Sequence, residues 1–162
     1  RQRAARSAAS SLETLALTPF GETQAPSETL PAHDSFDCVL VDAPCSGFGT
    51  VRRNPALKWR LQQRTVARLA ERQRVILSRN AAYVRSGGIL VYATCSLLPQ
   101  ENEAIITRFL SSRKEFTLDP LQPAFLRQDI DLPGLHPDAG SMTVHPALLD
   151  SDGFFLARMR RG

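Results

Sequence analysis

The sequence predicts an α/β fold, in which helices cover a sheet that contains parallel strands. Two short apolar runs, FDCVLVD at 36–42 and ILVYATC at 89–95, are typical of strands that are buried on both faces. Between them, apolar residues recur at helical spacing over 62–85. A strand, a helix and a second strand in succession indicate a parallel pair joined by a crossover helix.

The segment before the first strand predicts little regular structure. Residues 1–12 are rich in Ala and Arg and predict the tail of a helix. Residues 18–34 are rich in Pro, Thr and Ser, which predicts a loop.

The helix over 62–85 has one apolar face and one basic face. Its apolar stripe consists of Val66, Leu69, Ala70, Ile76, Leu77, Ala81 and Val84. Its opposite side carries Arg64, Arg68, Arg72 and Arg79. The apolar stripe predicts packing against the sheet, and the run 86–88 (Ser-Gly-Gly) predicts the end of the helix.

After the second strand, the pattern predicts one more helix and two more strands. Pro99 opens the helix, with Glu101 and Glu103 in its first turn. Its apolar stripe is Ile105, Ile106, Phe109 and Leu110. The strands are expected at 115–119 and 153–160, and the Pro-rich stretch between them, 120–150, reads mostly as loop.

Composition excludes several classes of protein. The apolar fraction of 43% excludes a wholly disordered chain. No apolar run approaches the roughly 18 residues that span a bilayer, and the basic start RQRAARSAASS has no signal-peptide core. Three cysteines do not form a disulfide framework, so we expect a protein of the reducing cytoplasm, without a membrane partner.

Charge is distributed unevenly along the chain. Residues 52–79 contain nine Lys or Arg and one acid, whereas 115–152 contain seven acids and one Arg. A positive face of this kind is compatible with a phosphate backbone. On charge alone, a solvated helix face is the simpler interpretation.

Two cysteines and a carboxylate follow the ends of the two predicted parallel strands. Asp42 and Cys45 come after the first strand and Cys95 ends the second, so all three are expected at one edge of the sheet. Cys38 lies mid-strand and is expected to be a small buried residue.

Several chemistries could use two such thiols. A redox pair would favour Cys-x-x-Cys spacing, which is absent. No metal site is expected, because the histidines have no ligand spacing; they are His33, His136 and His145. A hydrolase with a histidine near one thiol remains open, as does a transfer reaction in which one thiol adds to the substrate and the other helps it leave.

Four sequence motifs favour the transfer reaction. In chain order they are DAPCSGFG, RRNPALKW, YATCSLLPQENE and DGFFLARMRR. Together they resemble the RNA cytosine-5 methyltransferases of the bacterial Sun type, from about Phe36 to the C-terminus. The resemblance implies a Rossmann-like fold dependent on S-adenosylmethionine, of which this chain would be the C-terminal half, a mixed sheet flanked by helices. It also implies methylation of carbon 5 of a cytosine in RNA, expected to be small-subunit ribosomal RNA.

The resemblance also assigns roles to the residues at the sheet edge. Cys95 matches the nucleophile that adds to carbon 6 of the base. Cys45 matches the second cysteine, which is associated with release of the enzyme. Asp42 matches an acid that lines the cofactor pocket and the cytosine edge, and Pro44 lies beside it in the same motif.

The basic block after Cys45 is the expected RNA contact. Arg52, Arg53 and Lys58 could bind phosphates that flank an extruded base. Trp59 could stack on a base, but a lone Trp at the start of a helix is more often a core anchor.

The chain departs from the family's pattern before Phe36. The Gly-rich cofactor loop is not matched there, so we expect residues 1–35 to be a remnant helix and Pro-rich loop, and 36–162 the C-terminal portion of a catalytic domain lacking its N-terminal half. The alternative function is a non-catalytic RNA-binding remnant of such an enzyme.

Overall fold

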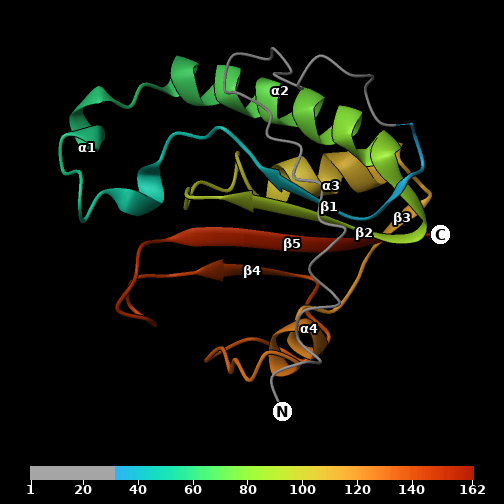
Figure 1. Cartoon of the computed structure of the whole chain (residues 1–162). Helices are drawn as coiled ribbons and strands as arrows, with labels where there is room; N and C mark the ends of the chain where they lie inside the picture. Colours follow the sequence, from blue (N-terminus) through green and yellow to red (C-terminus); the bar gives the residue numbers. More distant parts are fainter. Residues whose placement is uncertain (1–31) are drawn as a thin grey trace. The chain divides into compact units, whose positions relative to one another are not determined.

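Five strands form one mixed sheet in a computed structural model that describes residues 32–162 (Figure 1). The strands are β1 (Phe36–Asp42), β2 (Val84–Thr94), β3 (Phe116–Leu118), β4 (Ser141–Val144) and β5 (Phe154–Arg161). Their order is β1-β2-β5-β3, with β4 also paired to β5. β1 and β2 are parallel and every pair that includes β5 is antiparallel, which confirms the predicted mixed sheet.

Helices and short turns connect the strands. They are η1 (Phe48–Thr50), α1 (Leu57–Arg60), α2 (Gln63–Asn80), η2 (Ala81–Tyr83), α3 (Glu103–Ser112) and α4 (Gln122–Leu126). α2 and α3 lie on the same side of the sheet in Figure 1. Within residues 32–162, no helix combines the length and the hydropathy needed to cross a bilayer.

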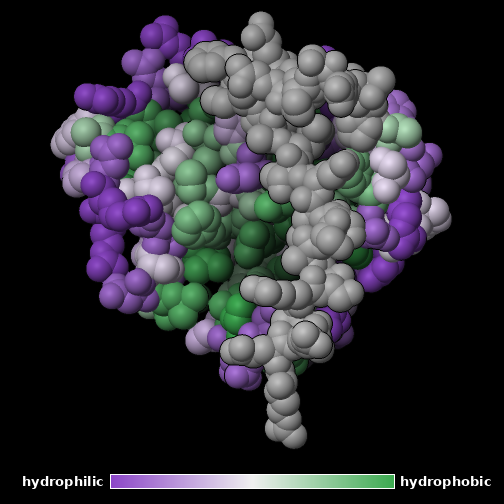
Figure 2. Space-filling view, in the orientation of Figure 1, coloured by the Kyte–Doolittle hydropathy of each residue, from purple (hydrophilic) through white to green (hydrophobic). Residues whose placement is uncertain are grey.

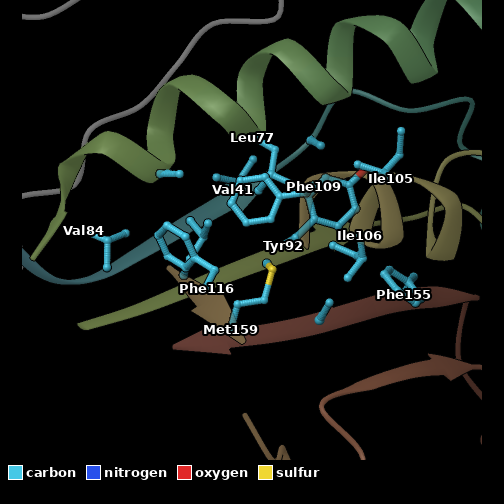
Figure 3. Close-up of a cluster of buried hydrophobic side chains, with 14 residues drawn as sticks. Val41, Leu77, Val84, Tyr92, Ile105, Ile106, Phe109, Phe116, Phe155 and Met159 are labelled. Atoms are coloured by element: carbon cyan, nitrogen blue, oxygen red, sulfur yellow. The ribbon is translucent and has the colours of Figure 1, made fainter. Parts of the chain in front are cut away.

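The hydrophobic core lies between the sheet and these two helices (Figure 3). α2 contributes Leu77, and α3 contributes Ile105, Ile106 and Phe109. The sheet contributes Val41, Tyr92, Phe155 and Met159, among others. The apolar stripes predicted for both helices therefore face the sheet, and the core fixes where the strands end.

The predicted helix over 62–85 extends five residues too far at its C-terminal end. α2 ends at Asn80, and β2 begins at Val84 and continues through the Ser-Gly-Gly run that was expected to end the helix. Pairing slips there, since Val84 lies opposite Phe36 but Ile89 lies opposite Cys38. Gly87 accommodates this bulge with a φ of 73°, a left-handed conformation that favours glycine.

β1 is covered on one face only, contrary to the prediction. Val39 and Val41 pack on the core, whereas Cys38 is exposed and Leu40 is 65% exposed. The burial expected for Cys38 is therefore wrong. α2 and α3 both lie on the other side of the sheet (Figure 1), so neither covers the face of β1 that carries Cys38 and Leu40.

The C-terminal elements follow the prediction with two corrections. α3 begins at Glu103, four residues after Pro99, so Glu101 precedes the helix and is fully buried. The stretch 120–150 contains α4 and the short strand β4, where only loop was expected. The strands near 115–119 and 153–160 are confirmed, whereas the helix predicted for 1–12 and most of the loop over 18–34 lie outside the described residues.

Leu77→Ala should lower the free energy of unfolding by about 2–5 kcal/mol, because a fully buried leucine would leave a cavity between α2 and the sheet. Urea denaturation followed by circular dichroism measures this loss. Leu148→Ala, at a position that is 56% exposed, serves as the control and should change stability by less than about 0.5 kcal/mol. Equal losses for the two variants would contradict this description of the core.

Candidate active site

The thiols of Cys45 and Cys95 meet beyond the ends of β1 and β2. Their sulfur atoms lie 3.3 Å apart, although the residues are 50 positions apart in the chain. Asp42 pairs with Ala93 in the parallel ladder, so the two strands end at the same edge of the sheet. The parallel pairing predicted from the sequence thus brings both cysteines together.

The hydrogen bond between the two thiols makes Cys95 the more acidic of the two. Either sulfur can donate in this geometry; with the Cys45 thiol as the donor, the hydrogen bond lowers the pKa of Cys95 to about 7. The same hydrogen bond, together with burial, raises the pKa of Cys45. Cys95 is therefore the thiolate of the pair, and the thiolate is the reactive form of cysteine.

Two carboxylates limit this effect. Negative charge on Asp42 and on Glu101 acts to raise the pKa of Cys95 and so opposes the effect of the hydrogen bond from Cys45. Asp42 is exposed at the end of β1. Half-buried Pro44 follows it, and its carbonyl oxygen accepts a hydrogen bond of 3.0 Å from Gln73 Nε2.

The buried carboxylate of Glu101 joins the two cysteine loops. From the Cys45 loop, the Ser46 N–H donates to Oε1 at 2.8 Å and the Ser46 hydroxyl donates to Oε2 at 2.5 Å. From the Cys95 loop, the Ser96 hydroxyl donates to Oε2 at 2.6 Å. Gln73 of α2 completes the set with a 3.0 Å hydrogen bond to Oε1. Each serine directly follows a cysteine, so Glu101 fixes how the two thiols face each other.

A second set of hydrogen bonds holds Glu101 itself in place. Tyr92 donates to the backbone carbonyl of Glu101 at 2.7 Å. The next residue, Asn102, accepts from Thr94 at 2.7 Å and donates to the carbonyl of Ser96 at 2.8 Å. All of these side chains are buried, so the turn before α3 is rigidly attached to the end of β2.

Gly49 connects the Cys45 loop by backbone hydrogen bonds to Cys95 and to the segment before β5. Its N–H donates to the carbonyl of Cys95 and its carbonyl accepts from the N–H of Gly153, both at 2.9 Å. A Cβ atom at Gly49 would lie 2.0 Å from the carbonyl oxygen of Gly153. Only glycine fits at this position.

Arg52 and Arg53 are engaged by acids from the loop before β5. Arg52 pairs with Asp150 and Arg53 with Asp152. The Asp152 side chain is only 8% exposed, so the pair with Arg53 compensates a nearly buried charge. Both arginines were expected to be available for RNA phosphates, and the structure instead gives them partners within the chain.

Lys58 and Trp59 have a different environment. Trp59 is 81% exposed, so the expectation of a core anchor is wrong. Lys58 Nζ lies 5.0 Å from the centre of its indole ring. α1 has only four residues and no buried side chain, so its tryptophan projects away from the core.

Sequence reasoning missed the polar network around the thiols. Gln73 falls on the apolar stripe of α2 and is fully buried, and a polar residue on a buried face was the available signal. Glu101 was assigned to the first turn of a helix. Among residues 32–162, no group of three or more His, Cys, Asp or Glu side chains is placed to hold a metal ion.

An α/β sheet that presents a thiol–thiolate pair beside a carboxylate defines a protein equipped for nucleophilic thiol chemistry. A family model described as 16S rRNA methyltransferase RsmB/F matches residues 8–160. The chain therefore belongs to this family of ribosomal RNA methyltransferases.

Individual relatives agree with this assignment. The chain is 38% identical to the probable ribosomal RNA small subunit methyltransferase B of Synechocystis sp., over 81% of this chain and 28% of the relative. It is 39% identical to ribosomal RNA small subunit methyltransferase B of Shewanella oneidensis, over 78% of this chain and 27% of the relative. The chain thus spans less than a third of the length of these relatives.

Solved structures support the same fold. A methyltransferase homolog protein from Pyrococcus horikoshii matches with a TM-score of 0.61 and 29% identity, over 79% of this chain and 40% of that one. NSun6 from P. horikoshii with SFG matches with a TM-score of 0.58 and 30% identity, over 75% of this chain and 29% of that one. The predicted Rossmann-like methyltransferase fold is confirmed.

Glu101→Gln should destabilise the chain by about 1.5–3 kcal/mol, because one acceptor oxygen becomes a donor that faces other donors. Urea denaturation measures the loss. The matched control is Glu103→Gln, two residues later, where the carboxylate is exposed and accepts a single hydrogen bond, from Thr143. A Glu101→Gln variant as stable as its control would contradict the role assigned to the buried carboxylate.

Cys45→Ala should raise the midpoint of the pH profile for Cys95 alkylation from about 7 to above 8, because the thiolate loses its hydrogen-bond donor. Rates of iodoacetamide modification under reducing conditions, read by peptide mass, give this midpoint. Cys38→Ser serves as a common background, since Cys38 is exposed. Cys45→Ser keeps a hydroxyl donor and should give an intermediate midpoint, and an unchanged midpoint in Cys45→Ala would refute the coupling.

Proposed function

We propose that this chain carries the nucleophile of an RNA cytosine-5 methyltransferase. The reaction transfers a methyl group from S-adenosylmethionine to carbon 5 of a cytosine, with a covalent bond between Cys95 and the base as intermediate. The 3.3 Å approach of Cys45 and Cys95, with Cys95 as the thiolate, is the observation that carries the proposal. Family membership supports an RNA substrate, and the relatives named for the small subunit favour ribosomal RNA.

The first step is the addition of the Cys95 thiolate to carbon 6 of cytosine. A carbon–sulfur bond forms, and the displaced electron pair makes carbon 5 nucleophilic. Asp42 is exposed at the end of β1, three residues before Cys45, so it can face the polar edge of the base. A proton held between its carboxyl group and the ring nitrogen would help carbon 6 accept the thiolate.

The second step joins carbon 5 to a methyl group. S-adenosylmethionine, when bound, would supply this methyl group from its sulfonium, whose methyl–sulfur bond would break to leave a neutral thioether as the bond to carbon 5 forms. Asp42 and Pro44 fit the edge of a pocket for it, because an exposed carboxylate can accept hydrogen bonds from an amino group and the half-buried proline ring offers an apolar contact.

The last step removes the proton from carbon 5 and breaks the bond between Cys95 and carbon 6. We assign the proton removal to Cys45. While Cys95 is a thiolate, it keeps Cys45 protonated through their hydrogen bond. Once Cys95 is bonded to carbon, that negative charge is gone, the pKa of Cys45 falls towards its ordinary value, and its thiolate becomes available as a base. The electrons of the carbon–hydrogen bond then expel Cys95 as thiolate.

RNA contacts are proposed for the basic stretch that follows the Cys45 loop. Lys58 has no ion-pair partner among residues 32–162, so it can bind a phosphate directly. Arg52 and Arg53 would contact phosphates by exchanging or sharing their aspartate partners. A ribosomal RNA substrate would place the protein in the cytoplasm.

Cys45→Ala should accumulate a covalent RNA–protein adduct, because the thiol that removes the carbon 5 proton is gone, whereas Cys95→Ala should form none. The chain is incubated with S-adenosylmethionine and small-subunit RNA, and adducts are detected by denaturing electrophoresis and peptide mapping. RNA that contains 5-azacytidine, whose ring lacks the removable proton, should trap the unaltered chain on Cys95.

Cys38→Ala is the matched control and should behave like the unaltered chain, because Cys38 lies outside the sulfur pair. An adduct mapped to Cys45 in place of Cys95, or normal methylation by Cys95→Ala, would refute the assignment. Salt-sensitive RNA binding without any adduct would favour a non-catalytic RNA-binding protein.

A further inference from the structure

Trp59 leaves a large aromatic surface in water. Its exposure of 81% is the highest among the exposed large hydrophobic side chains of residues 32–162. Tryptophan gains more than most side chains from burial, so this ring is free to bind a flat partner group, and the charges around it indicate which kind.

The backbone holds Trp59 in this exposed position. The Trp59 N–H donates to the carbonyl of Ala56 at 3.2 Å, and the N–H of Leu61 donates to the carbonyl of Leu57 at 3.0 Å. The Leu57 side chain packs next to Gly47: a Cβ atom added to Gly47 would lie 3.7 Å from Leu57 Cδ1. α1 therefore contacts the Cys45 loop through Leu57, at a glycine two residues after Cys45. Trp59 lies in the same four-residue helix.

Cations without acidic partners surround this tryptophan along the chain. Lys58 contacts the ring, and the cations that follow it are Arg60, Arg64 and Arg68. None of these four has an ion-pair partner among residues 32–162, in contrast to Arg52 and Arg53. Arg64 and Arg68 line a hollow together with Gln62 and Thr65.

The space-filling view agrees with this distribution. Hydrophilic side chains gather along the edge of the molecule where Figure 1 places α1 and the first turns of α2 (Figure 2). An exposed aromatic ring within a run of unpaired cations is the combination by which proteins bind single-stranded nucleic acid.

We propose that Trp59 is a stacking platform for an unpaired RNA base, and that Lys58, Arg60, Arg64 and Arg68 bind the phosphates on either side. This inference rests on the proposed function and names the conformation of its substrate: a single strand that approaches beside the Cys45 loop. A duplex fits poorly, because its bases are stacked on each other and cannot cover the indole ring. The principal RNA contact is thereby moved from Arg52 and Arg53 to α1 and the start of α2.

Trp59 is the only tryptophan in the 162 residues, so fluorescence reports on it alone. A ten-nucleotide single-stranded RNA should quench the emission of the full chain by about half or more at saturation, because a stacked base contacts the excited ring. A duplex of the same length, at equal occupancy measured by anisotropy, should quench much less.

Affinity of the same single strand for variants gives the second readout. Trp59→Ala should weaken binding about tenfold, and Trp59→Phe, which keeps an aromatic face, should lie within about threefold of the unaltered chain. Phe154→Ala removes an exposed aromatic from β5 and should change nothing. Arg68→Ala should reduce the dependence of binding on salt, whereas Arg127→Ala, at an exposed position next to α4, should not.

The outcomes separate this inference from the proposed function. If Trp59→Ala binds the single strand as tightly as the unaltered chain, or if the duplex quenches equally at equal occupancy, the stacking platform is refuted, even where Cys95 still forms its adduct. If quenching and the tenfold loss are observed, the platform stands, even where no adduct forms. Failure of the chain to bind any RNA refutes it and favours a protein partner for Trp59.

Discussion

The arrangement of the thiols depends on one buried carboxylate. Burying the charge of Glu101 is unfavourable unless donors surround it, and the chain supplies four of them: two from Ser46 and one each from Ser96 and Gln73. These donors come from the two cysteine loops and from α2. The interaction that satisfies the charge is therefore also the one that brings Cys45 and Cys95 to 3.3 Å.

The sulfur pair in turn determines the order of the chemistry. Their hydrogen bond lowers the pKa of Cys95 and raises that of Cys45, so Cys95 ionises first while Cys45 keeps its proton. Bond formation at Cys95 removes the charge that restrained Cys45. A single hydrogen bond thus suffices to separate the attacking thiol from the releasing one in time.

Much of this arrangement could be predicted from the sequence. The features that could not be predicted all depend on contacts between distant parts of the chain. Parallel strands follow from local apolar runs, and parallel strands place Cys45 and Cys95 at one edge without further information. Ser96 is a near neighbour of Glu101, but Gln73, Ser46 and the Asp152 partner of Arg53 lie 28, 55 and 99 positions from the residues they bind, which no local pattern reveals. The burial predicted for Cys38 and Trp59 is wrong for the same reason. Their residue types suggest burial, but whether another element covers them depends on tertiary structure.

The Cys45 loop is held from two sides, and this constrains how RNA can act on the site. Gly49 is fixed between the backbones of Cys95 and Gly153, and Arg53 attaches the end of the same loop to Asp152, ahead of β5. The short segment between Arg53 and α2 carries Trp59 and has no buried side chain in α1. An RNA strand stacked on Trp59 would therefore contact a segment that lies outside the core. Such binding need not move the thiols, since the hydrogen bonds of Glu101 hold the two cysteine loops independently of α1.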